Sequence, residues 1–335
     1  MIPLRISPVV FLLFVLGNSA KLLAADAPAA EQKPLPVALV DAFNKLSNGP
    51  HQGFRANHAK GVMVEGTFTP SPLAASFSKA PHFVKSVAVL VRFSDPTGVP
   101  TLPDADPNAS PHGMAIRFTL PDGSFTDIVC LSANSFPVAT PEDFLAFLQA
   151  ASQSGPDVPK PTPIDKFLSA HPAALKFVST PRPPPASFGT LAFYGINAFK
   201  FTNAAGVSHY ARYQIIPIAG EHALSESETK NAAPNYLMDE LPKRMTRGPV
   251  EFRLLAQLAN EGDSVNDPTA VWPIDRKLVP LGTISLTKTV KDQVAAQKSI
   301  MFNPLNLQAG IEPSADPVLL ARPAAYGVSF SQRIR

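Results

Sequence analysis

Two short segments of the chain carry side chains whose types and spacing suit chemistry. In the first, Arg55 stands three residues before His58, and Gly61 follows just before a predicted strand. Histidine is the side chain best suited to accept and return a proton near neutral pH. In the second, Arg322 stands four residues before Tyr326. On a helix this spacing lets the guanidinium hydrogen-bond the phenolic oxygen, which favours the phenolate.

Neither segment belongs to a standard hydrolase or nucleotide-binding motif. The chain has no G-x-S-x-G, no Walker loop, no H-E-x-x-H and no G-x-G-x-x-G. Its seven histidines are scattered, and its single cysteine, Cys130, excludes an intrachain disulfide and a Cys-rich metal site. The 29 basic and 26 acidic residues give a net charge of +3, too small and dispersed to indicate nucleic-acid binding.

The elements that must position these side chains are mostly strands. The 335 residues are 45% hydrophobic, enough for a sizeable core, and the 37 prolines limit helix length. Alternating apolar segments and turn signals predict strands at residues 62–68, 86–93, 114–120, 124–131, 189–202, 207–217, 250–258 and 279–286. The pattern predicts an α+β fold: an antiparallel sheet or barrel with helical insertions.

Helices are predicted in the connections between these strands. Apolar spacing predicts one from Val37 to Leu46, and an N-cap at Thr140 starts another that ends near Ser152. Residues 156–186 are expected to form a long surface connection with a single short helix at 164–174. Further helices are expected at residues 236–245 and 314–326, the latter with a proline inside.

The N-terminus is predicted to be an export signal. Arg5 provides a positive charge, Val9–Leu16 is apolar, and small residues follow before position 27. We expect a signal peptide over residues 1–27, a linker over 28–36 and one domain over 37–335. The mature protein would then be exported, to the periplasm in a Gram-negative host, with no membrane segment after cleavage. An uncleaved membrane anchor is the alternative, although the apolar run is short for a span.

The two chemical segments and several others, in order, resemble a known family. Phe54–Gly61 resembles the distal-histidine segment of the haem catalases, R-x-x-H-A-x-G. The colinear matches that follow are Val91–Ser94, Pro111–Phe118, Asp122–Val129, Val271–Pro273, Leu278–Gly282, Phe302–Pro304, Gly310–Glu312, Ser314–Asp316 and Arg322–Tyr326. We therefore identify the chain as a member of the catalase superfamily. It is most similar to the small catalase-related peroxidases, whose fold is a closed antiparallel haem barrel with helical insertions.

The resemblance implies a role for each chemical side chain around a b-type haem. Tyr326 would be the axial ligand of the iron, and Arg322 would hydrogen-bond its oxygen. His58 would move a proton between the two peroxide oxygens. Ser94 would hold the imidazole through its hydroxyl. Without the resemblance, Tyr326 would be interpreted as an ordinary buried tyrosine.

The resemblance also implies side chains that hold the haem itself. Arg55, Arg92 and Arg333 match the three arginines that bind the propionates, and an arginine fork suits a carboxylate. Phe144 matches the aromatic residue that packs on the haem face. Taken singly, each arginine is equally explained as a solvated charge and Phe144 as a core residue.

The sequence departs from the family pattern at three places. The distal asparagine is matched by Leu131 position by position, or by the catalytic candidate Asn134 after a small shift of register. Asn57 stands before His58, where the family usually has an apolar residue. After Tyr326 the usual P-D-T-H run is replaced by Gly327–Phe330.

These departures favour one of several activities within the family. The leading hypothesis is a haem peroxidase that reduces hydrogen peroxide or organic peroxides with small organic donors, through a ferryl intermediate. The alternatives are a true catalase, a lipid-hydroperoxide isomerase, and an exported haem-binding barrel without turnover. The expected partners are peroxide and a donor, without nucleic acid, and the sequence leaves a homo-oligomer open.

Overall fold

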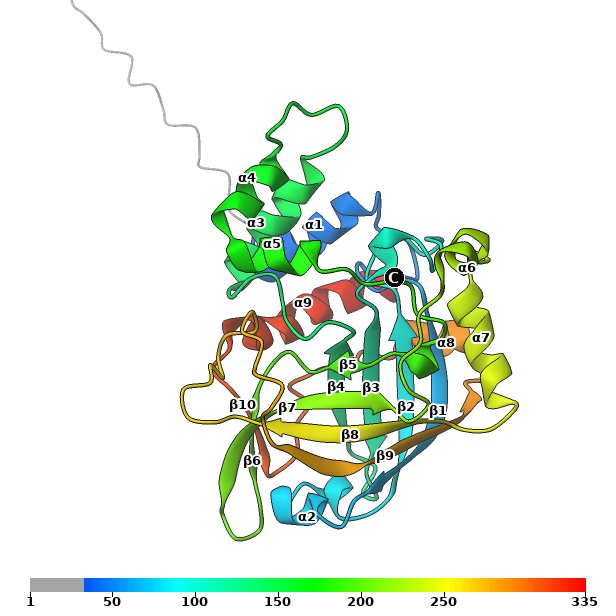
Figure 1. The fold of residues 1–335 in the computed structure, drawn as a ribbon, viewed down its shortest axis with the longest axis vertical. Helices are drawn as coiled ribbons and strands as arrows, with labels where there is room; N and C mark the ends of the chain where they lie inside the picture. Colours follow the sequence, from blue (N-terminus) through cyan, green and yellow to red (C-terminus); the bar gives the residue numbers. More distant parts are fainter. Residues whose placement is uncertain (1–32) are drawn as a thin grey trace, which may run out of the picture. The chain divides into compact units, whose positions relative to one another are not determined.

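An antiparallel β-barrel forms the centre of the fold (Figure 1). The computed structural model describes residues 33–335, so the predicted signal peptide and most of the linker lie outside the described residues. Eight strands close the ring in the order β1 (Gly61–Pro70), β2 (Val87–Ser94), β3 (Gly113–Thr119), β4 (Phe125–Leu131), β5 (Phe193–Tyr194), β7 (Ser208–Pro217), β8 (Val250–Leu258) and β9 (Leu278–Thr289). Strands β6 (Phe199–Thr202) and β10 (Ile311–Pro313) extend outward from β7.

Helices are inserted between the strands and around the ring (Figure 1). They are α1 (Leu35–Leu46), α2 (Ala74–Phe77), α3 (Pro141–Ser152), α4 (Pro163–Ala170), α5 (Pro172–Ser179), α6 (Glu226–Asn231), α7 (Tyr236–Met245), α8 (Gln293–Ser299) and α9 (Pro317–Arg333). A small apolar cluster of α1 and α3 packs on Ala325 of α9. Within residues 33–335, the helices are all too short or too polar to cross a membrane.

The two faces of β1–β4 differ in chemistry. Alternate residues point into the barrel, where Phe68, Phe93, Phe118, Phe193 and Phe252 are all fully buried in one core. The residues between them point out of the barrel. The strand register aligns them in rows across the sheet: Gly61, Ser94, Gly113 and Leu131 in one row, and Met63, Arg92, Ala115 and Val129 in the next.

The α+β barrel predicted from the sequence is confirmed. The hairpin between β3 and β4 turns at Gly123, whose φ of 83° suits glycine. The helix predicted after Thr140 is present, and the Thr140 hydroxyl accepts a hydrogen bond from the Asp143 amide. Strand β8 and helix α7 occupy the predicted residues.

Four details of the predicted elements are wrong. The helix expected at 314–326 is α9, which begins at Pro317 and continues to Arg333. The single helix expected at 164–174 is two helices, because Pro172 has no N–H and restricts the backbone of His171, where α4 ends. The strand expected at 189–202 is divided into β5 and β6. Strand β9 is not the last, since β10 follows it and pairs with β6.

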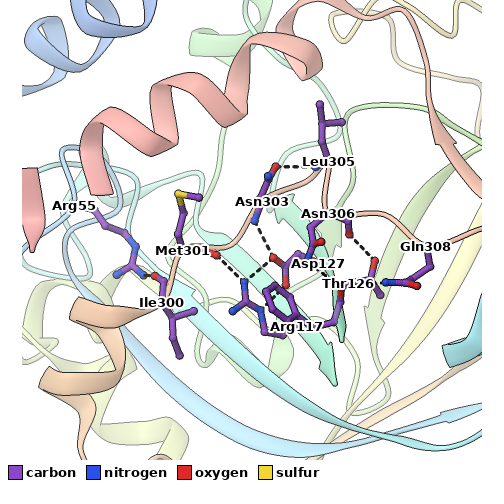
Figure 2. Close-up of polar contacts among 11 residues, drawn as sticks. Arg55, Arg117, Thr126, Asp127, Ile300, Met301, Asn303, Leu305, Asn306 and Gln308 are labelled. Carbon is purple, nitrogen blue, oxygen red and sulfur yellow. Dashed lines mark hydrogen bonds and ion pairs between the residues drawn. The ribbon is translucent and has the colours of Figure 1, made fainter. Parts of the chain in front are cut away.

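A segment from Ile300 to Gln308 is fastened across the outside of β3 and β4 (Figure 2). Arg117 donates two hydrogen bonds of 2.8 Å to the carboxylate of Asp127 and one of 2.6 Å to the carbonyl of Met301. Asp127 accepts a further bond of 2.9 Å from the Asn303 amide. Because Asp127 is fully buried, this pair fixes where the segment, and with it the Ile300 carbonyl, lies.

We expect Asp127→Ala to destabilise the fold strongly. It leaves the Arg117 guanidinium without a carboxylate and releases Asn303, and breaking a buried pair costs about 3–5 kcal/mol. Urea unfolding measures the change. Lys230→Ala, which breaks an exposed pair with Glu226, is the control and should cost less than about 1 kcal/mol. Equal losses in the two variants would show that the pair does not hold the segment.

Candidate active site

His58 lies against the outer row of β2 and β3. Its Nδ1 is 3.0 Å from the Ser94 hydroxyl oxygen, so the hydroxyl holds the ring. Its backbone φ is 58°, in the left-handed region that is uncommon for a residue other than glycine. Backbone strain of this kind collects at functional sites, where the surrounding structure has to impose it.

Two glycines let charged and polar side chains lie flat on this face. A Cβ on Gly113 would be 2.8 Å from Cε1 of His58 and 2.9 Å from the Ser94 oxygen. A Cβ on Gly61 would be 2.6 Å from a guanidinium nitrogen of Arg92. A larger residue at position 113 would require the imidazole to move, and one at position 61 would also meet the Phe93 carbonyl oxygen.

His58 is held as a neutral base. Its side chain keeps some accessible surface, yet it lies deep in the protein, and burial lowers its pKa to about 3. The positive charges of Arg92, Arg55 and Arg322 lower the pKa further. Since the lowered pKa lies far below neutrality, the imidazole accepts a proton only from a bound reactant and carries no charge of its own at neutral pH.

Tyr326 is the end of a chain of hydrogen bonds. Its oxygen accepts two bonds from Arg322, of 3.0 Å from Nε and 2.8 Å from Nη2. Arg322 also donates to the amide oxygen of Asn197 at 2.7 Å, and Asn197 donates to Asp316 at 2.6 Å. Asp316 caps the first turn of α9. The guanidinium is thus fixed by Asn197, and two of its N–H groups point at the phenolic oxygen.

Three arginines meet beside His58. Arg55 and Arg333 each donate a hydrogen bond of 2.9 Å to the same oxygen, the Ile300 carbonyl. Arg92 donates to the carbonyls of His58 and Ala59 at 2.9 and 3.1 Å. Among residues 33–335, none of the three forms an ion pair with a carboxylate.

The pKa values of all three guanidinium groups are lowered, chiefly by burial. Burial lowers the pKa of Arg92 to about 9 and that of Arg333 to about 10. The pKa of Arg55 is also held well below its usual value, by burial and then by the charges of Arg92 and Arg333. A dianion placed between the three guanidinium groups would relieve this repulsion.

The comparisons with known proteins agree with this geometry. A family model described as "Catalase" matches residues 50–335. The chain belongs to the catalase family.

Two relatives are similar over most of their length. The chain is 36% identical over 302 residues to a catalase-related peroxidase of Mycolicibacterium paratuberculosis, covering 89% of this chain and 94% of that protein. It is 35% identical over 293 residues to a catalase-related peroxidase of Synechococcus elongatus, covering 86% and 85%. The catalase of Mus musculus is 29% identical over 301 residues, which is 84% of this chain and 56% of that protein.

A solved structure has the same fold. A fungal catalase structure matches with a TM-score of 0.75 and 24% identity, over 88% of this chain and 62% of that one. The barrel and its helices are therefore the catalase arrangement.

Family members generally bind haem, and the residues of this chain fit that group. Haem carries two carboxylates, and the cluster of Arg55, Arg92 and Arg333 lacks an anion within the described chain. A tyrosine oxygen is the iron ligand typical of catalases, and Tyr326 offers one. Helix α9 lies between the barrel and α1 (Figure 1). None of its residues from Leu320 to Gln332 is buried, so a flat ligand could cover this part of the helix.

The two candidates for the position of the distal asparagine, Leu131 and Asn134, lie in different places. Leu131 pairs with Gly113 in the outer row, and directly opposite residues of antiparallel strands share a face. Leu131 is therefore on the face that carries Ser94 and His58. Asn134 lies three residues beyond the end of β4. No hydrogen bond from its side chain to His58 is present within the described chain.

Phe144 lies in an aromatic cluster beside α9. Its ring centroid is 5.7 Å from that of Phe43 and 4.8 Å from that of Phe136. It also packs with the small apolar cluster that contacts Ala325. Phe144 therefore joins α1, α3 and the loop after β4.

Several residues of the site were not predicted from the sequence. Asn197 and Asp316 support Arg322, Gln297 accepts a hydrogen bond of 3.0 Å from Arg92, and Ile300 offers only its carbonyl. A backbone carbonyl leaves no signal in the sequence. In the sequence, Asn57 differs from the apolar residue usual in the family. Its side-chain amide oxygen is buried without a hydrogen-bond partner among the described residues.

We expect Gly113→Ala to displace the His58 ring. The added methyl would overlap Cε1 of His58, and a shift of about 1 Å can reduce a rate by roughly 10²-fold. The measurement is peroxide consumption per protein molecule, with histidine ring signals in NMR spectra as a second readout. Gly155→Ala is the matched control because nothing lies within 4 Å of its added Cβ. A Gly113→Ala variant with wild-type rate and spectrum would contradict this packing.

Proposed function

We propose that the protein is a haem-dependent peroxidase that reduces hydrogen peroxide or organic peroxides with small organic donors. For a phenolic donor the overall reaction is H2O2 + 2 ArOH → 2 H2O + 2 ArO•, in which each phenol gives one electron and one proton. The observation that carries this proposal is the neutral His58 held beside three arginines without a carboxylate partner in the described chain.

The chain's own residues divide the work of holding the cofactor. Tyr326, fixed by Arg322, would ligate the iron, and Arg55, Arg92 and Arg333 would bind the propionates. Phe144 lies in the cluster that supports α9 and would pack toward the ring. When bound, haem supplies an iron that accepts electrons from the donor and passes them to peroxide.

His58 would act as the proton shuttle. It accepts the proton of one peroxide oxygen and returns it to the other, which leaves as water. The low pKa, with its cause in burial and in the neighbouring arginines, keeps the imidazole free to accept at neutral pH. Protonation of His58 itself would stop the step only as the pH approaches the lowered pKa. Ser94 keeps the ring oriented during both transfers.

The outer row that contains Ser94, Gly113 and Leu131 favours a peroxidase over a true catalase. Catalases oxidise a second peroxide, 2 H2O2 → 2 H2O + O2, which requires that molecule to be held in line and stripped of both hydrogens. An apolar Leu131 on this face cannot hydrogen-bond it. An organic donor needs no such alignment, since it can deliver electrons at the edge of the cofactor. Cleavage of the first peroxide, which both activities share, would remain fast, and oxidation of a second peroxide would be slow.

We also propose that the protein is exported. The support is the positive, then apolar, then small-residue pattern of residues 1–27.

The activity is tested by comparing two rates on one preparation of known haem content. Oxygen release from hydrogen peroxide reports dismutation, and oxidation of a phenolic dye reports peroxidase turnover. We expect dye oxidation to dominate at equal peroxide concentration. Oxygen release at the rate of a dedicated catalase with negligible dye oxidation would instead assign the protein as a true catalase.

His58→Ala is the control within this experiment. Removal of the general base should lower both rates by about 10²-fold or more while haem content stays the same. Turnover without the histidine at the wild-type rate would remove His58 from the reaction. A protein that holds haem but turns over neither substrate would be a haem-binding barrel. Conversion of a fatty-acid hydroperoxide without a donor would indicate an isomerase.

A further inference from the structure

A separate cavity lies beside the backbone of Arg55 and Arg333, two of the three clustered arginines. It has a volume of about 140 Å³ and is lined by the loop after α1 and the residues at the end of α9, among them Pro50, His51, Phe54, Ala56, Gln332 and Arg335. Arg55 lies between two lining residues, and Arg333 follows a third. The two backbone segments that line the cavity therefore also carry Arg55 and Arg333, whose guanidinium groups would bind the propionates.

The cavity is large enough for the ring of one small aromatic molecule. A cavity of about 150 Å³ holds a single benzene ring. Hydrogen peroxide is far smaller than this volume, and a fatty-acid chain or a polycyclic dye is far larger. A molecule with one six-membered ring matches it.

The apolar part of the wall suits an aromatic ring. Pro50 and Ala56 are apolar, and Phe54 leaves 45% of its surface exposed, available to cover a ligand. An aromatic ligand would cover Phe54 and gain an aromatic contact.

The polar part of the wall suits a phenol that carries an anionic group. His51 Nε2 is 2.9 Å from the Ser47 carbonyl, which can only accept, so Nε2 carries the hydrogen and Nδ1 is left as an acceptor for a phenolic hydroxyl. Arg335 is exposed, and no carboxylate within residues 33–335 forms an ion pair with it. A guanidinium in that position favours a ligand carboxylate.

The cavity is built before any ligand arrives. The Phe54 amide donates to the His51 carbonyl at 3.0 Å, and the Ala56 amide donates to the Ser329 hydroxyl of α9 at 3.1 Å. The side chains of Asn44 and Gln332 join at 3.1 Å. Such a site loses little conformational freedom on binding.

We propose that this cavity binds the reducing donor, and that the donor is a single-ring phenolic acid. The inference rests on the proposed peroxidase function, and it places the donor next to the residues that would hold the propionate edge of the haem. Each donor gives one electron toward that edge and one proton, in the stoichiometry written above. The peroxide is handled separately, at His58.

Direct binding of 4-hydroxybenzoate tests the cavity without turnover. Calorimetric titration of the purified, haem-containing protein in the absence of peroxide gives the dissociation constant. Phe54→Ala removes an aromatic wall and should weaken binding about 5-fold, and Arg335→Gln should weaken it about 10-fold, the range for loss of a charge-assisted hydrogen bond. Leu73→Ala and Arg247→Gln, an exposed apolar residue and an exposed cation elsewhere, are the matched controls and should bind as the wild type does.

Steady-state kinetics then connect the cavity with the reaction. With 4-hydroxybenzoate as donor, KM should rise in both cavity variants. With phenol, which lacks the carboxylate, only Phe54→Ala should raise it. The rate of the peroxide step measured without donor should stay unchanged, since neither residue contacts His58.

The outcomes separate this inference from the proposed function. Unchanged binding and KM in both variants, in a protein that oxidises 4-hydroxybenzoate, would show that the donor binds elsewhere and would overturn the inference alone. Binding that depends on Phe54 and Arg335 in a protein that oxidises no phenolic donor would leave a ligand cavity and overturn the peroxidase function.

Discussion

The organisation of this protein depends on three like charges held together. Burial lowers the pKa of Arg55, Arg92 and Arg333, and neighbouring positive charges lower the pKa of Arg55 and Arg92 further. Within the described chain their guanidinium groups donate only to backbone and side-chain amide oxygens. A buried charge without a partner costs several kcal/mol, so an arrangement of this kind is stable only if an anion compensates it. We interpret the cluster as the receptor for two carboxylates. Burial, and then the charges of Arg92 and Arg55, keep His58 neutral.

The barrel supplies the flat face on which this chemistry is arranged. Gly61 and Gly113 sit in one register row and let Arg92 and His58 approach the strands closely. The segment after α8 places Ile300 between two of the cations, and the buried pair of Arg117 and Asp127 fixes that segment. Helix α9 carries Arg322 and Tyr326, and its own N-cap, Asp316, is part of the hydrogen-bond chain that orients them. Strands, loop and helix are thus linked through a few polar contacts.

Local signals explain which parts of this fold were predictable from the sequence. Strand β8 and α7 were placed correctly because apolar alternation, helical spacing and turn residues all agree there. The helix expected at 164–174 was wrong because the apolar spacing continues through Pro172, whereas the backbone cannot. The resemblance brought His58, Ser94, Arg55, Arg92, Arg333, Arg322 and Tyr326 together as candidates, and the geometry groups them. Asn197 and the Ile300 carbonyl were not predictable, since their roles exist only once distant segments meet. The face on which Leu131 lies follows from the strand register, which no local pattern encodes.

The most direct test of this account is a titration of the haem-free protein with ferric haem and, in parallel, with its dimethyl ester. The ester has the same iron and ring but no propionate charges, so the two affinities isolate the arginine cluster. We expect one haem bound per chain and an affinity for the ester at least about 10²-fold weaker, because two charge-assisted contacts are lost. Equal affinities for haem and its ester, or no stoichiometric binding of haem, would contradict it.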